Sequence, residues 1–331
     1  MKLATYSLKE DKKERFGFLM EQYMIDVNLA SIWANEKQDE YDFKKIAPTL
    51  KIALEKWDNN ILHLNKLQEY LIKEQILTKK GLPFYLDNKF ATNIKNICFH
   101  SPVPNPQSFR DFYAFEQHVK SARKLRGLEM NPDWYKIPIF YFSNPAALYG
   151  HKENVPYPSG TKELDFELEF AAIIANGGSN INKKDAGQYI AGYTICNDWS
   201  ARDFQREEMP MSLGPAKGKD FATSFGPYLV TPDELKENFI NDKLHLRMTC
   251  HINDKLISDG NTNDLYHPFE AMIERASKNT KILPGDYFGS GTVGTGCILE
   301  LRPENTGGWL KKGDVVKLEV EKLGVLENII K

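Results

Sequence analysis

The segment Glu163–Ala172, ELDFELEFAA, alternates acidic and apolar side chains from its first residue. Alternation with a period of two is typical of a β-strand, because successive side chains point to opposite faces of the sheet. The acidic face of this predicted strand would carry Glu163, Asp165, Glu167 and Glu169. Like charges along one strand face repel each other. The segment therefore predicts a strand whose acidic face needs a source of positive charge.

A divalent cation is one such source, because carboxylate oxygens suit Mg²⁺, Mn²⁺ and Ca²⁺. Glu167 and Glu169 lie two residues apart, so both would point the same way from a strand. The alternative is an acidic strand face that is simply solvated. Acids from other parts of the chain would favour the metal. Of the two remaining acids, we expect a structural hydrogen bond for Asp165 and a solvent-facing position for Glu163.

Two other segments supply such acids. The segment NDWSARDFQREE, residues 197–208, places Asp198 directly after the apolar run IAGYTIC, at the end of a predicted strand. The segment FRDFYAFEQHVKSARK, residues 109–124, contains Asp111 and, seven residues later, His118. If this segment is helical, Asp111 and His118 share one face and point in one direction. The four carboxylates and this histidine fit an oxygen-ligated metal beside a general base.

Length and composition are those of a globular protein. The chain has 331 residues, of which 41% are hydrophobic and 27% charged, with a net charge of −2. Both signs of charge are interspersed, so no nucleic-acid or membrane partner is indicated. No apolar run has membrane-spanning length and no apolar signal segment is present, so we expect a cytoplasmic protein. Four widely spaced cysteines without a CxxC pair favour reduced, mostly buried thiols.

Residues 1–98 are predicted to form a small α+β domain. The stretches KLATYSL and RFGFLMEQYMIDVNLA have the composition of short strands. Apolar residues at helical spacing follow in residues 46–76. The stretches GLPFYLDN, residues 81–88, and SPVPNPQSF, residues 101–109, contain turn-forming residues and separate this unit from the rest.

Residues 99–331 are predicted to form a second, strand-rich domain. The strand candidates are IPIFYFS, ELDFELEFAAIIA, IAGYTICND, GPYLVT, LHLRMTCHI, YFGSGTVGTGCILEL and VVKLEVEKLGVLENII. The helix candidates are NINKKDAGQYIAG and YHPFEAMIERASKN. No regular βαβα alternation occurs, which disfavours a doubly wound parallel sheet. We therefore expect an α+β fold whose β-rich part is a mixed roll or sandwich around the site.

The stretch GSGTVG, residues 289–294, fits the G-x-G-x-x-G pattern of dinucleotide-binding proteins. That pattern needs a helix at its end, because the helix N-terminus holds the pyrophosphate. Here TGCILEL follows, which we expect to be a strand. We therefore reject a dinucleotide site and interpret the glycines as a close approach of two backbones.

Six motifs resemble those of the fumarylacetoacetate hydrolase family, and they occur in the family's order: RDFYAFEQH, LDFELE, NDWSARDFQ, GPAKGKDFATSFGP, SGTVGTG and LEL. The resemblance covers about residue 99 to the end. It implies a divalent-metal hydrolase that cleaves a C–C bond in a fumarylacetoacetate-like or acylpyruvate-like 1,3-diketo acid. It also implies a homodimer and a role in tyrosine breakdown or another aromatic-degradation pathway.

The resemblance also assigns roles to individual residues. The metal ligands would be Asp111, Glu167, Glu169 and Asp198. The general base would be His118, oriented by Glu300 in a predicted strand, while Lys219 or Arg202 would offset the developing oxyanion. Substrate groups would be contacted by Tyr113, Tyr141, Arg202, Gln205, Lys219 and Thr292.

Several alternatives stay open at this point. An isomerase or decarboxylase could use the same metal site, and a catalytically silent metal-binding protein could keep it. Tyr141 is not followed by the family's His-Gly-Arg stretch, and Arg123 or Arg126 could supply the missing cation. Arg202 could instead pair with Asp203. Glu300 could face solvent, Lys217 is expected to be solvated, and the metal could be Mg²⁺, Mn²⁺ or Ca²⁺.

Overall fold

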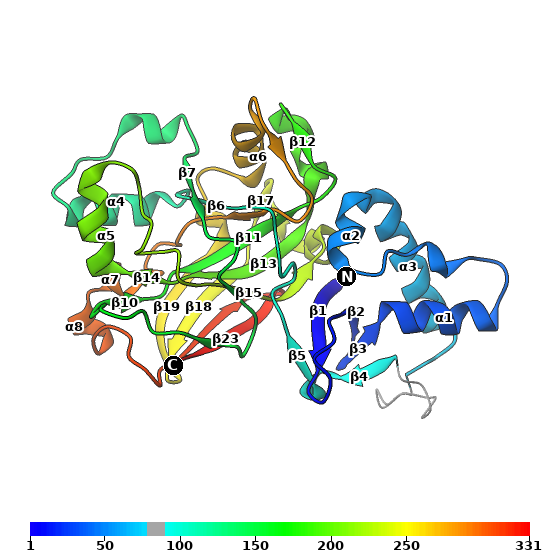
Figure 1. Cartoon of the computed structure of the whole chain (residues 1–331). Helices are drawn as coiled ribbons and strands as arrows, with labels where there is room; N and C mark the ends of the chain where they lie inside the picture. The colour runs from blue at the N-terminus through cyan, green and yellow to red at the C-terminus, as the bar shows by residue number, and fades with distance from the viewer. Residues whose placement is uncertain (78–89) are drawn as a thin grey trace.

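The computed structural model describes residues 1–77 and 90–331, and in these ranges the chain forms a twelve-stranded sheet, a five-stranded sheet and flanking helices (Figure 1). The stretch GLPFYLDN, predicted to separate two domains, lies outside the described residues. Among the helices of the described residues, none has the length and apolar character needed to cross a membrane.

The first part of the chain contributes an antiparallel run of strands covered by helices. Its elements are β1 (Lys2–Leu8), β2 (Arg15–Met20), β3 (Tyr23–Asp26), α1 (Val27–Lys37), η1 (Phe43–Lys45), α2 (Leu50–Glu55), α3 (Trp57–Lys73), β4 (Ala91–Asn93), η2 (Ile94–Asn96) and β5 (Ile97–Phe99). The VNLA stretch was expected to end a strand, but it begins α1. The reason is Asp26, whose side chain caps this helix by accepting a hydrogen bond from the N–H of Leu29 at 3.0 Å.

These N-terminal strands continue into the sheet of the later residues. Strand β1 pairs antiparallel with β15 (Thr223–Val230), with Lys2 opposite Val230. The path of the sheet is β4-β3-β2-β1-β15-β13-β11-β21-β6-β7, where β13 is Ile190–Asp198, β11 Leu168–Ile174, β21 Tyr287–Gly289, β6 Phe109–Phe112 and β7 Phe140–Ser143. One sheet thus spans both predicted domains, and the boundary after residue 98 stays a prediction.

A second sheet packs against the first. Its order is β19-β18-β22-β23-β9, formed by Lys255–Asn261, Arg247–Ile252, Val315–Val320, Gly324–Ile330 and Asn154–Val155. Strands β11, β13 and β15 of the large sheet contact β18, β22 and β23, and Phe170 and Leu318 belong to the apolar core between them. The expected α+β fold with a β-rich sandwich is confirmed.

The remaining elements connect or flank these sheets: η3 (Pro132–Tyr135), α4 (Glu116–Leu125), β8 (Leu148–Tyr149), β10 (Leu164–Asp165), β12 (Gly178–Ser179), η4 (Lys183–Tyr189), β14 (Ser200–Ala201), α5 (Arg202–Glu208), η5 (Met209–Met211), η6 (Pro232–Asn238), β16 (Phe239–Ile240), β17 (Lys243–Leu244), η7 (Thr262–Asp264), α6 (Phe269–Ser277), β20 (Lys281–Ile282), α7 (Ile298–Leu301) and α8 (Pro303–Thr306). The stretch NINKKDAGQYIAG forms the 3₁₀ helix η4 and the start of β13 rather than an α-helix.

The acidic segment is not one continuous strand. It breaks at Phe166 and Glu167 into β10, which pairs with β14, and β11, which pairs with β13. The N–H of Glu167 leaves the ladder and donates to the side chain of Asn197 at 3.0 Å. This side-chain bond satisfies the backbone N–H group of Glu167 at the break between the two strands.

The glycine-rich stretch after β21 forms turns, not a strand. Gly291 has a φ of +76°, and a Cβ at this position would lie 2.4 Å from the carbonyl oxygen of Phe112. Only glycine permits both that conformation and that approach. The stretch TGCILEL, expected to be a strand, contains the four-residue helix α7 instead.

Candidate active site

Three carboxylates from two segments of the chain lie close together beside strands of the large sheet. They belong to Asp111 on β6, Glu167 directly before β11, and Glu169 on β11. One oxygen from each lies within 4.8 Å of the other two. All three side chains are buried, so the alternative of a solvated acidic face does not hold for them.

A glycine allows this meeting. Strand β21 lies between β6 and β11, and its Gly289 is opposite Asp111 on one side and Ala171 on the other. A Cβ on Gly289 would lie 2.2 Å from Oδ1 of Asp111. The carboxylate of Asp111 therefore occupies the space that any other residue at position 289 would fill.

Asp111 and His118 do not share a helix face, so that expectation was wrong. Asp111 lies on β6, which pairs on both sides, with β21 and with β7. The helix α4 begins only at Glu116 and carries His118. Strand pairing and the burial of Phe109 and Phe112 outweigh the helical spacing of this segment.

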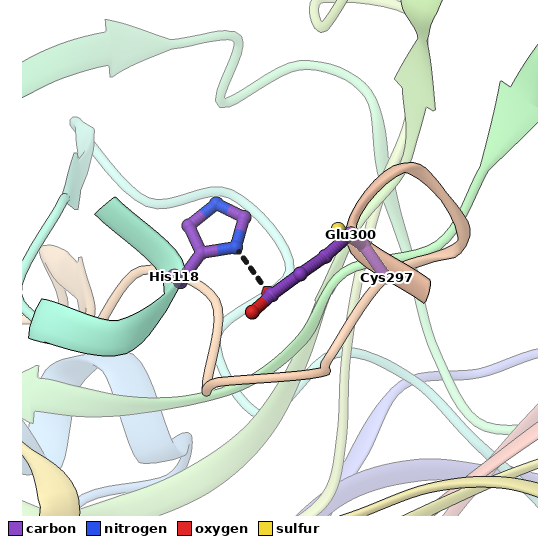
Figure 2. A group of neighbouring side chains, drawn as sticks. All are labelled: His118, Cys297 and Glu300. Atoms are coloured by element: carbon purple, nitrogen blue, oxygen red, sulfur yellow. Dashed lines mark hydrogen bonds and ion pairs between the residues drawn. The ribbon is translucent and has the colours of Figure 1, made fainter. Parts of the chain in front are cut away.

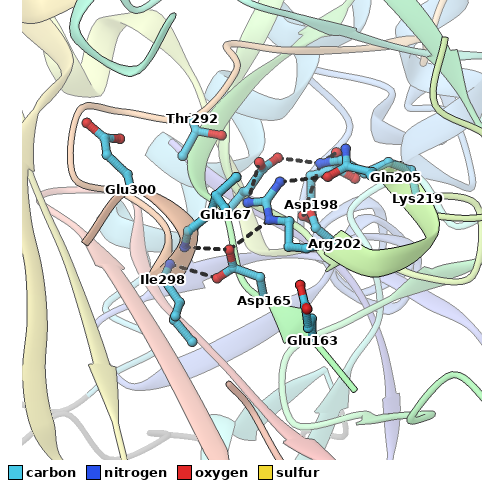
Figure 3. A network of polar contacts seen from close by, with 12 residues as sticks. Glu163, Asp165, Glu167, Asp198, Arg202, Gln205, Lys219, Thr292, Ile298 and Glu300 are labelled. Atoms are coloured by element: carbon cyan, nitrogen blue, oxygen red, sulfur yellow. Dashed lines mark hydrogen bonds and ion pairs between the residues drawn. The ribbon is translucent and has the colours of Figure 1, made fainter. Parts of the chain in front are cut away.

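Two buried cations from α5 and the following loop neutralise the middle of the acidic segment (Figure 3). Arg202 donates from Nε to Asp165 and from Nη2 to Glu167, each at 2.8 Å. Lys219 donates from Nζ to Glu167 and, at 2.5 Å, to Asp198. Burial alone would raise the pKa of Glu167, but Lys219 and Arg202 lower it to about 2.

The first two acids of the segment, Glu163 and Asp165, differ in their surroundings. Asp165 accepts hydrogen bonds from the N–H groups of Ile298 and Leu299 at 2.7 and 3.0 Å, which confirms its expected structural role. Glu163 pairs with Arg206 near the surface and lies apart from the buried network in Figure 3. Its side chain is 24% exposed, so it is partly rather than fully solvent-facing.

Asp111 and Glu169 lack a comparable counter-charge. Oδ1 of Asp111 and Oε2 of Glu169 are buried and receive no hydrogen bond from the residues that the structure describes, while the other oxygen of Glu169 accepts a bond from Thr292 at 3.3 Å. Burial and then repulsion by neighbouring carboxylates raise the pKa of both groups well above the usual value. Unpaired buried oxygens of this kind need a partner. The donor set of three carboxylates fits a hard divalent cation, as the sequence predicts.

Asp198, the fourth predicted ligand, ends β13, and both of its carboxylate oxygens accept hydrogen bonds. One oxygen accepts bonds from Lys219 and from the hydroxyl of Tyr141, and the other accepts from Thr223 at 3.3 Å. Burial and the charge of Asp198 raise the pKa of Tyr141 well above its usual value. Coordination of a metal by Asp198, and of substrate by Tyr141, stays a prediction.

His118 and Glu300 form the predicted pair (Figure 2). Nδ1 of His118 lies 3.0 Å from Oε2 of Glu300, whose side chain is 7% exposed rather than solvent-facing. Burial would raise the pKa of Glu300, but the bond to His118 lowers it. Donation from Nδ1 to this carboxylate leaves the lone pair on Nε2 available to accept a proton.

Glu300 lies on the short helix α7, not on a strand as expected. Asp165 explains the difference, because its carboxylate accepts the first N–H groups of this helix and so stabilises its start. The sequence analysis also missed Cys297, which precedes α7 and lies beside His118 and Glu300. The spacing in CILE could have indicated this residue, because Cys297 and Glu300 are three residues apart and such residues share one face of a helix.

The remaining predicted residues surround these groups. The ring of Tyr113 lies edge-on to His118 with centroids 5.6 Å apart, and burial raises the pKa of Tyr113 to about 12. Gln205 accepts a hydrogen bond from Arg202 at 2.9 Å. Asp203 accepts bonds from Thr161 and Lys162 rather than pairing with Arg202, and exposed Lys217 pairs with Asp220.

A surface pocket of about 700 Å³ lies elsewhere, between η3, η4 and α6. Tyr135, Lys183, His267 and Arg275 are among its lining residues. None of the predicted site residues lines it. This pocket and the buried carboxylates are therefore separate features of the molecule.

The sequence of this chain is similar to those of known proteins. A family model described as "Fumarylacetoacetate (FAA) hydrolase C-terminal" matches residues 107–331. The chain is 30% identical to a mitochondrial oxaloacetate tautomerase (fahd2) of Xenopus laevis, over 85% of this chain and 86% of that protein. It is 26% identical to the oxaloacetate tautomerase YisK of Bacillus subtilis, over 88% of this chain and 89% of that protein.

Two solved structures resemble the whole chain. A fumarylacetoacetate hydrolase from Exiguobacterium antarcticum matches with a TM-score of 0.69 and 20% identity, covering 100% of this chain and 99% of that one. A maleylpyruvate hydrolase from Sphingobium, solved with manganese(II) and pyruvate, matches with a TM-score of 0.66 and 20% identity, covering 100% and 98%. At this identity the structural likeness shows the fold.

Proposed function

The chain belongs to the fumarylacetoacetate hydrolase family, and on that premise we propose that it hydrolyses a C–C bond in a 1,3-diketo acid with the help of a divalent cation. The substrate would be fumarylacetoacetate-like or acylpyruvate-like. The observation that carries the proposal is the 3.0 Å bond between His118 and Glu300, which prepares a general base whose charge acts on the buried carboxylate of Glu167.

Asp111, Glu167 and Glu169 would hold the cation, with Asp198 as a further candidate ligand. When bound, the cation would polarise the two carbonyl oxygens of a 1,3-diketone, which present a chelating pair. The manganese and pyruvate in the Sphingobium maleylpyruvate hydrolase structure support a divalent cation and a 2-oxo acid.

The residues of the chain would carry the proton transfers. Nε2 of His118 accepts a proton from water, and the resulting hydroxide attacks the carbonyl carbon. Glu300 holds the ring orientation through Nδ1 and stabilises the imidazolium. When the C–C bond breaks, the proton passes from His118 to the leaving carbon, so one water is consumed and two acids form. Lys219, which pairs with Glu167 and Asp198, would offset negative charge on the attacked carbonyl oxygen.

A second candidate is the tautomerisation of oxaloacetate. The relative from Xenopus laevis carries this activity in its name and is similar over most of both chains. In this reaction His118 would move a proton between carbon and the enol oxygen, with no attack by water and no broken C–C bond. An isomerase or decarboxylase would use the same cation and the same base. The expected homodimer and the expected role in aromatic degradation are proposals of the same kind.

Product analysis separates these reactions. Protein stripped of metal is supplied with Mg²⁺, Mn²⁺ or Ca²⁺ and given 2,4-diketo acids, fumarylacetoacetate and oxaloacetate. Two acids from a diketo acid, formed only with metal and lost in His118→Ala and Glu167→Ala, would support the hydrolase. Exchange of the oxaloacetate tautomers without cleavage of any diketo acid would overturn it in favour of the tautomerase. The surface variant Arg206→Met serves as the control for general damage.

A further inference from the structure

Cys297 lies beside the His118–Glu300 pair and has no part in the proposed reaction. One potential ligand atom from each of these three side chains lies within 4.8 Å of the other two. His118 and Cys297 are buried, and little of the Glu300 side chain is exposed. Figure 2 shows Cys297 next to Glu300, with His118 across from them on its helix.

The local structure holds these side chains in place. Cys297 precedes the first residue of α7, and Glu300 follows it by three residues on the same turn. Asp165 fixes this turn by accepting the N–H groups of Ile298 and Leu299. Glu300 is already 3.0 Å from His118. The cluster is therefore organised before any ion binds, which reduces the ordering cost of binding.

The donor atoms differ in kind from those of the carboxylate cluster. An imidazole nitrogen, a sulfur and a carboxylate oxygen form a mixed set that Zn²⁺ takes in tetrahedral sites, with water in the fourth position. Mg²⁺ and Ca²⁺ prefer oxygen ligands alone, as offered by Asp111, Glu167 and Glu169. The two clusters should therefore select different cations, because thiolate ligands favour softer ions.

We propose that His118, Cys297 and Glu300 form a second cation site that binds Zn²⁺ or a similar thiophilic divalent ion, and that an ion in this site inhibits the enzyme. Binding replaces the thiol proton of Cys297 with a metal–sulfur bond, and the proton passes to water. The inhibition rests on the proposed function, because the ion occupies the general base and its partner. The cation site itself stands on the geometry alone.

The direct test uses Co²⁺ as a spectroscopic substitute for Zn²⁺, added to the full chain in the presence of saturating Mg²⁺. A cobalt–thiolate charge-transfer band that saturates at one equivalent is expected, because the carboxylate cluster contains no sulfur. The band should be lost in Cys297→Ser. It should persist in Cys250→Ser, which alters another fully buried cysteine, on β18.

Two further measurements keep the proposal testable if Cys297→Ser does not fold. X-ray absorption at the zinc edge on the unaltered protein should show one sulfur at about 2.3 Å. The Zn²⁺ concentration for half-inhibition, relative to each variant's own rate, should rise about tenfold or more in Cys297→Ser and stay unchanged in Cys250→Ser. No sulfur in the zinc shell, or a cobalt band that survives in Cys297→Ser, would overturn the site. A band without inhibition would keep the site and reject His118 as the base.

Discussion

Two regions of the buried carboxylate network balance their charge in different ways. Around Asp165 and Glu167 the positive charge comes from the protein itself, through Arg202 and Lys219. Around Asp111 and Glu169 one oxygen of each carboxylate receives no hydrogen bond from the described residues, and their pKa values are raised by burial and repulsion between carboxylates. We infer that Asp165 holds the fold together and that Asp111 and Glu169 are reserved for a cation. Glu167 belongs to both regions, because it pairs with Arg202 and Lys219 and also lies in the three-carboxylate cluster.

Removing Arg202 should cause the largest loss of stability. In Arg202→Met the carboxylates of Asp165 and Glu167 lose a buried partner, and an uncompensated buried charge typically costs about 3–5 kcal/mol. Urea unfolding, followed by tryptophan fluorescence, would measure the change. The matched control is Arg206→Met, which breaks the more exposed pair with Glu163 and should cost less than about 1 kcal/mol. Equal losses in the two variants would remove the distinction between the buried and the exposed pair.

Loss of the general base should affect turnover and leave the cation region intact. We expect His118→Ala to lower kcat/KM for the diketo acid by about 10²–10⁴-fold, the typical contribution of a general base. The rise in melting temperature on addition of Mn²⁺ should be the same as in the unaltered protein. Near-normal turnover in this variant would show that another residue moves the proton.

Neutralising Glu169 tests the second region. At a metal concentration about 100 times the dissociation constant, binding should stabilise the unaltered protein by about 2.7 kcal/mol. In Glu169→Gln this gain should be largely lost, while the metal-free variant should be no less stable than the unaltered protein because a like charge has been removed. Glu163→Gln, in the same segment, should keep the full gain. A metal-free Glu169→Gln that unfolds like Arg202→Met would show that the two regions are alike.

A smaller effect concerns pH and arises outside both regions. Burial lowers the pKa of His151 to about 4, and its Nδ1 accepts a hydrogen bond from the N–H of Glu327 at 3.2 Å. Because the folded-state pKa is below the unfolded value, the unfolded chain binds the proton first. Stability present above pH 6.5 should therefore be lost as the pH falls toward 4. His151→Gln should reduce this loss of stability, which urea unfolding at several pH values would measure. An unchanged pH profile in the variant would assign the loss to other groups.

In the acidic segment, the local sequence pattern predicted some features of the site and not others. Its alternation predicted that Glu167 and Glu169 point the same way, and their carboxylates do lie in one cluster. The order of the motifs identified the family. The alternation did not show the strand break, because the group that satisfies Glu167 is Asn197, thirty residues away. It also did not show that Arg202 neutralises the acids, since that pairing depends on how β10 meets β14.

Two expectations about secondary structure failed for a similar reason. The spacing of Asp111 and His118 fits a helix, but pairing on both edges of β6 places Asp111 in the sheet. Glu300 was expected on a strand, because CILEL ends a stretch that was predicted to be a strand. The carboxylate of Asp165, more than a hundred residues earlier, stabilises a helix start there instead. In each case a contact between distant segments outweighed the local preference.

The central claim is that Asp111, Glu167 and Glu169 hold a divalent cation. The most direct measurement is anomalous diffraction at the manganese edge from crystals of the protein grown with Mn²⁺. The account predicts a single strong peak within bonding distance of carboxylate oxygens from these three residues, absent in crystals of Glu169→Gln. A map with no peak there, or with a peak bound only by other residues, would contradict it.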